Sequence, residues 1–127
     1  MSDAVDSWKE QAQYDLETAR AMLASGRFLY VLFCCQQAVE KALKALIVQK
    51  TGAVPPRTHN LKQLADTAGI ELSDECRRFL EELTAYYIQS RYPEEIRRMG
   101  ASIRREQAEQ TLRQTEGEIQ WLLSMPK

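Results

Sequence analysis

The sequence is poor in the residues that build metal centres and covalent cross-links. Its 127 residues include one histidine, His59, and three cysteines, of which Cys34 and Cys35 are adjacent. An odd number of cysteines, two of them adjacent in the sequence, makes a poor disulfide framework. Because the sequence has no C-x-x-C spacing, a zinc site is not expected. We therefore expect a reducing compartment, the cytoplasm, and neither a metal nor another cofactor.

Long apolar runs and an excess of one charge are also missing. No run approaches the roughly 18 apolar residues of a membrane-spanning helix, and the N-terminus, MSDAVDSWKE, is acidic and polar, unlike a secretory signal. Lysine plus arginine number 17 against 18 acidic residues, a net charge of −1. This balance is atypical of DNA-coating proteins and polybasic membrane anchors. We expect neither membrane binding nor specific DNA binding, although a local basic cluster can still bind phosphate.

Helical periodicity, in contrast, runs along nearly the whole chain. Apolar residues recur every three or four positions, and the periodic segments end at glycine or proline. The helices expected are 4–24, 27–50, a short one capped by Asn60 and ended by Gly69, one from Ser73 to the break at Tyr92-Pro93, and 102–124, with one more turn at 93–99. The sequence predicts an all-α domain over residues 1–127, an up-and-down helical bundle of four to five helices, because short connections favour antiparallel neighbours.

The segment 27–50 carries an unusual polar stripe. At about 100° per residue, one sector of this helix holds five polar side chains: Gln36, Gln37, Glu40, Lys41 and Lys44. Towards the helix ends the same sector is apolar, at Phe33, Ile47 and Val48. One interpretation is a solvated stripe in which Glu40 and Lys44 form an i,i+4 ion pair. The other, which we favour, is a polar patch at a subunit interface or in a groove.

Charge balance adds to this second interpretation. If contact shields the stripe, Glu40 can neutralise one of the two lysines, Lys41 and Lys44, but not both. Burying an unpaired charge is costly. The sequence therefore predicts an anion from outside the stripe, either a phosphate or a partner's carboxylate.

An arginine cluster and the single histidine can each be interpreted either as structural or as functional. Five arginines between residues 91 and 105 can bind phosphate through bidentate contacts or can pair with neighbouring glutamates. We favour pairing for the later four, and less so for Arg91, beside Tyr92. His59 can pack or bond to backbone, or it can titrate in a site, because the unperturbed pKa of histidine lies near neutrality.

Three ordered motifs resemble the HEPN family, the higher-eukaryote and prokaryote nucleotide-binding domain. They are FCCQQAVEKALK from Phe33 to Lys44, RTHNL from Arg57 to Leu61, and YIQSRYP from Tyr87 to Pro93. The resemblance covers nearly the whole chain. It implies a prokaryotic helical bundle that commonly dimerises and is often encoded beside a small nucleotidyltransferase.

Many HEPN proteins are metal-independent ribonucleases, often toxins, whose signature is an arginine followed after four to six residues by a histidine. Arg91 occupies the arginine position, but positions 96 to 98 hold isoleucine and two arginines. Without that imidazole the usual acid–base group is missing. An enzyme is therefore not the favoured interpretation.

The leading hypothesis is an accessory module, toxin–antitoxin-like, that forms a homodimer and binds nucleotide, RNA phosphate or a nucleotidyltransferase partner. The residues expected to line its groove are Gln37, Glu40, Lys41, Lys44, His59, Arg91 and Tyr92. One alternative is a ribonuclease that uses Arg91 with His59 or Glu40 as a substitute base. A second alternative is a plain dimerisation module.

Overall fold

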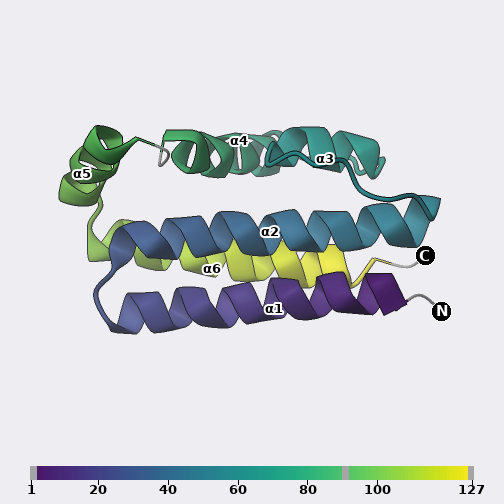
Figure 1. The fold of residues 1–127 in the computed structure, drawn as a ribbon, viewed down its shortest axis with the longest axis horizontal. Coiled ribbons are helices and arrows are strands. Elements are labelled where there is room, and N and C mark those ends of the chain that lie inside the picture. Colours follow the sequence, from purple (N-terminus) through teal and green to yellow (C-terminus); the bar gives the residue numbers. More distant parts are fainter. Residues whose placement is uncertain (1–2, 90–91, 126–127) are drawn as a thin grey trace.

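The computed structural model describes residues 3–89 and 92–125, and within these ranges every regular element is a helix (Figure 1). The elements are α1 (Asp3–Ala24), α2 (Phe28–Thr51), α3 (Leu61–Thr67), α4 (Asp74–Gln89), α5 (Pro93–Ser102) and α6 (Arg105–Leu123). The prediction of an all-α helical bundle is confirmed. The described residues form six helices rather than the predicted four to five, because residues 93–102 form a complete helix.

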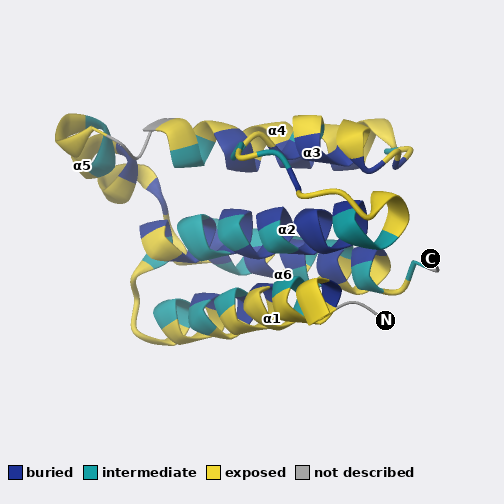
Figure 2. Ribbon diagram, turned by 45° about the vertical axis from the view of Figure 1, so that its right-hand side comes forward, coloured by how far each residue is buried: buried dark blue, intermediate teal, exposed yellow. Residues whose placement is uncertain are grey.

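Helix α2 is the central element of the bundle. It packs against α1 and α6 on one side and against α3 and α4 on the other, and Figure 1 shows α5 at the end of the bundle where α2 begins. Most residues of α2 are buried (Figure 2). A helix that is apolar around most of its circumference is buried in this way, which explains why the segment is the most apolar of the chain.

The helix ends follow local capping rules. The Asn60 side chain accepts a hydrogen bond from the Gln63 N–H at 3.0 Å, and Ser73 Oγ accepts one from the Cys76 N–H at 3.1 Å, as predicted for both caps. At the end of α2, Gly52 adopts a left-handed conformation with φ of 70°. Glycine takes this conformation without the steric cost of a Cβ atom.

Helix α5 is longer than the sequence predicts. The sequence predicts a single turn at 93–99, but the structure has a ten-residue helix that continues through Gly100. Helix α6 begins at Arg105 rather than near residue 102. Met99 and Ile103 are buried in a small second core against the start of α2, with Leu29 and Leu32. Burial of these side chains offsets the cost of an interior glycine, about 1 kcal/mol.

No described helix combines the length and apolar character that crossing a membrane requires. The three cysteines are all free, and Cys35 and Cys76 are buried. Burial raises the pKa of both thiols to about 12, so they remain protonated at neutral pH.

Candidate functional site

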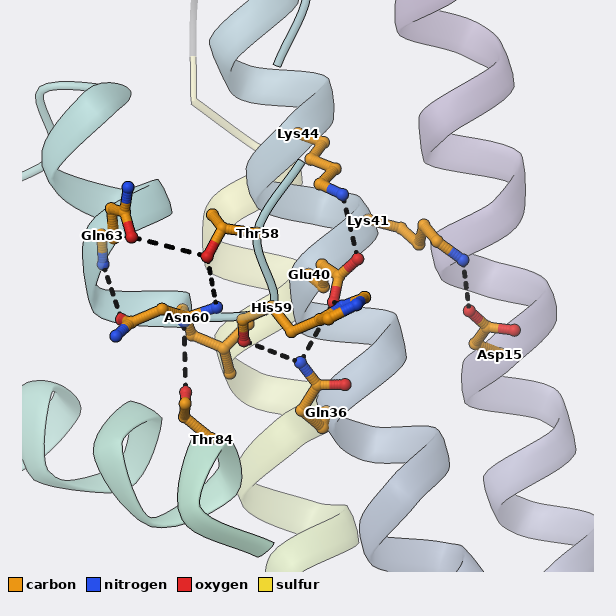
Figure 3. Close-up of polar contacts among 11 residues, drawn as sticks. Asp15, Gln36, Glu40, Lys41, Lys44, Thr58, His59, Asn60, Gln63 and Thr84 are labelled. Atoms are coloured by element: carbon orange, nitrogen blue, oxygen red, sulfur yellow. Dashed lines mark hydrogen bonds and ion pairs between the residues drawn. The ribbon is translucent and has the colours of Figure 1, made fainter. Parts of the chain in front are cut away.

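The polar stripe of α2 meets the loop that precedes α3. At its centre is Glu40, whose side chain is 3% exposed. Glu40 Oε1 lies 2.8 Å from His59 Nδ1 and accepts a hydrogen bond from Gln36 Nε2 at 3.1 Å. Lys44 Nζ donates to the other carboxylate oxygen at 3.0 Å (Figure 3). The i,i+4 pair predicted from the sequence is therefore present, but it is buried.

Gln36 links the backbone of the loop before α3 to the Glu40 carboxylate. Its Nε2 donates both to Glu40 and to the backbone carbonyl of His59, the latter at 3.1 Å. Leu61 N–H in turn donates to Thr84 Oγ1 at 3.1 Å, which ties the start of α3 to α4. The loop is thus held from both sides, and the His59 ring has a defined position over α2.

The network determines the charge of Glu40. Burial alone raises the pKa of this carboxyl group, but the hydrogen bonds from His59, Lys44 and Gln36 outweigh burial and lower the pKa below its usual value. Glu40 is therefore ionised at neutral pH. Because a carboxylate only accepts hydrogen bonds, Nδ1 of His59 carries the hydrogen between them.

Lys41 has its own counter-charge within the chain. Its Nζ lies 3.3 Å from Asp15 of α1, and both side chains are about one-fifth exposed, at 19% and 20%. Lys44 also lies over the Trp8 ring, 5.5 Å from its centroid. The prediction that the lysines need an anion from outside the chain is therefore wrong. Glu40 pairs with Lys44 and Asp15 of α1 pairs with Lys41, and the periodicity of α2 alone cannot reveal the second pair.

The outer face of His59 is the accessible part of this network. The side chain is 42% exposed, and its ring packs against Tyr87 of α4 with centroids 4.5 Å apart. The described residues show no partner for Nε2. A histidine whose Nδ1 is held by a buried carboxylate presents Nε2 in a fixed orientation, and it can bind an anion or exchange a proton there.

Among the described residues, two further predicted site residues, Gln37 and Tyr92, make no hydrogen bond to this network. Gln37 is half-buried on α2. Tyr92 is 64% exposed and precedes α5. Arg91 falls outside the described residues. Of the later arginines, Arg98 pairs with Glu95, as the glutamate interpretation predicts.

Sequence reasoning missed three contributors to the site. Gln36 belongs to the predicted stripe but not to the predicted site residues. Asp15 and Tyr87 come from helices on opposite sides of α2. Tyr87 does begin one of the quoted motifs, which is a usable signal. Asp15 carries none, because its role depends on how α1 packs. No group of three metal-binding side chains occurs within the described ranges.

Fold and site together define a helical bundle with a histidine held over its central helix. The family model of the HEPN domain matches residues 5–125, and the chain belongs to the HEPN family. The crystal structure of TT1696 from Thermus thermophilus has a similar fold, with a TM-score of 0.81 and 25% sequence identity over 96% of this chain and 98% of that chain. Among curated proteins, none matches this sequence.

Proposed function

We propose that this HEPN protein is an accessory module that binds the phosphate of a nucleotide or of RNA, without cleaving it. It acts as a homodimer, and a nucleotidyltransferase encoded nearby is its partner in a toxin–antitoxin-like pair. The family supports the nucleotide-related class of ligand. The assignment to phosphate binding without cleavage is supported by the site around Glu40 and His59.

The single observation that carries the proposal is the Glu40–His59 pair. Glu40 Oε1 lies 2.8 Å from Nδ1, and the His59 side chain, which is 42% exposed, packs beside Tyr87. A phosphate oxygen that accepts a hydrogen bond from Nε2 would gain a charge-assisted contact when the ring is protonated. Tyr87 adds an aromatic face next to it.

The remaining candidate residues take different roles in this proposal. Glu40 and Lys44 position His59 from within the bundle, since neither is exposed enough to meet a ligand. Gln37 and Lys41 belong to the stripe as well and are half-buried. Tyr92, which is 64% exposed and precedes α5, and its sequence neighbour Arg91 are the remaining candidates for contact with the ligand.

Titration of the full chain with a mononucleotide, a dinucleotide and a short single-stranded RNA tests the proposal. Binding should weaken with added salt. His59→Gln should weaken it about tenfold, the loss of one hydrogen bond to a charged group of about 1.5 kcal/mol. Lys62→Ala, an exposed lysine paired with Asp66 on α3, is the matched control. Absence of binding, or equal binding by His59→Gln, contradicts the proposal and leaves the dimerisation module.

A second candidate is a metal-independent ribonuclease in which His59 replaces the missing signature histidine. The same geometry favours it, because a carboxylate-oriented imidazole is a common general base. Arg91 would then stabilise the charge on the scissile phosphate. We rank it second, because the signature positions themselves lack a histidine.

A further inference from the structure

A groove between α4 and α6 lies apart from the His59 site. It encloses about 150 Å³. Phe79 and Leu83 of α4 are buried beneath it. The opposite wall comes from one face of α6, where Gln107, Gln110 and Gln114 recur at helical spacing.

The three glutamines make the α6 side of this groove polar. Gln107 Nε2 donates to the Tyr86 hydroxyl at 2.7 Å, which bridges the groove between the two helices. Gln110 and Gln114 have no hydrogen-bond partner among the described residues. Each side-chain amide therefore offers a donor and an acceptor to a ligand.

The charge of the groove limits what it can bind. Glu82 is the one charged residue among the described residues that line it, and none of these is a lysine or an arginine. A phosphate group would meet a carboxylate without a compensating cation. The groove instead suits a molecule without negative charge that donates hydrogen bonds to Glu82.

The size of the groove narrows the class of ligand further. Pockets for whole small-molecule ligands usually measure about 300–1,000 Å³, so this groove has room for a single ring system. Tyr86 provides an aromatic contact, and glutamine amides can pair with both donors and acceptors on the edge of a nucleobase.

We propose that the α4–α6 groove is a nucleobase pocket that prefers guanine. Guanine has two adjacent N–H donors on its Watson–Crick edge, and these match the two acceptor oxygens of the Glu82 carboxylate. Gln110 and Gln114 bond to the acceptors of the same base. Uracil presents one N–H between two carbonyl oxygens and would place an acceptor against the carboxylate.

The base pocket and the phosphate site lie on different faces of α4. Tyr86 lines the groove, whereas its neighbour Tyr87 packs on His59. Consecutive helical residues point about 100° apart, so the two sites suit different nucleotides of one RNA. The inference rests on the proposed function for its natural ligand, but a nucleoside without phosphate tests the groove alone.

Titration of the isotope-labelled full chain with guanosine and with uridine, followed by nuclear magnetic resonance, tests this pocket. Guanosine should shift the side-chain amide signals of Gln110 and Gln114 and bind about tenfold more tightly than uridine, within the range of one specific base contact. Glu82→Gln should abolish the preference. Glu81→Gln, the adjacent exposed residue outside the lining, should keep it.

Equal binding of the two nucleosides, no shift at the glutamines, or an unchanged preference in Glu82→Gln would overturn the base pocket. The two proposals fail separately. Guanosine monophosphate that shifts His59 but not Gln110 and Gln114 rejects the groove alone. Shifts at the glutamines without any change at His59 reject the phosphate site alone.

Discussion

The Nδ1 atom of His59 lies 2.8 Å from Oε1 of Glu40, so a loop residue with a 42% exposed side chain is joined to one of the most buried carboxylates of the chain. Lys44 and Gln36 complete the same network. Loop position, helix packing and site geometry therefore depend on one ionised group.

Glu40 should make stability dependent on acid pH. Its pKa is lowered in the folded chain, so its contribution is present above the unfolded pKa, about 4.3, and is lost as pH falls through the folded pKa. Glu40→Gln should flatten this acid-side loss. It should also lower the free energy of unfolding at pH 7 by about 3 kcal/mol, because Lys44 stays buried without its counter-charge.

Urea unfolding at several pH values between 3 and 7 measures both effects. Glu10→Gln, an exposed carboxylate on α1, serves as the control and should behave like the parent. If the parent and Glu40→Gln lose stability in parallel on acidification, the network does not determine the acid response.

The two lysines of the stripe should differ in their effect on stability. Lys44→Ala leaves the buried Glu40 without its ion-pair partner and should cost about 3 kcal/mol. Lys41→Ala breaks the half-buried pair with Asp15 and should cost about 1 kcal/mol. Lys62→Ala, in an exposed pair, should cost less than about 0.5 kcal/mol. Urea unfolding at pH 7 should give this order, and equal costs would show that burial of the pairs is unimportant.

The protein should form a homodimer through the exposed side of the first half of α2. Tyr30 is 46% exposed there and packs edge-to-face on the half-buried Phe33, with centroids 5.3 Å apart. Aromatic residues of this kind are enriched in interfaces. Sedimentation at micromolar concentration should give about twice the mass of one chain. Tyr30→Asp should shift the measured mass towards that of the monomer.

Tyr14→Asp provides a matched control for the dimer. Tyr14 is 67% exposed on α1, so this substitution carries the same change in charge and size. It should leave the dimer intact. A monomeric parent would contradict the assembly itself, whereas dissociation by both variants would contradict the assignment to α2.

Single-stranded RNA should remain intact in the presence of the purified protein and a metal chelator. The expected rate is no higher than that of Arg91→Ala, because the signature histidine is absent from positions 96 to 98. Electrophoresis of labelled RNA measures this. Cleavage that is lost in both Arg91→Ala and His59→Ala would instead establish the ribonuclease, the second candidate.

Local signals in the sequence determined most of the helices and their ends. Asn60 and Ser73 act as caps within three residues of their partners, and Glu40 pairs with Lys44 one turn away. Such contacts depend on chemistry between near neighbours, which helical periodicity describes well. The all-α fold follows from the same periodicity.

Tertiary structure decided the contacts between segments that are distant in the chain. Glu40 meets His59 across 19 positions and Lys41 meets Asp15 across 26, and Tyr86 reaches Gln107 only because α4 and α6 face each other. Helix α5 likewise passes Gly100 because Met99 and Ile103 pack on α2. Periodicity shows which face of a helix is polar, but it contains no information on which helix or loop covers that face, since packing of the whole chain sets the neighbours.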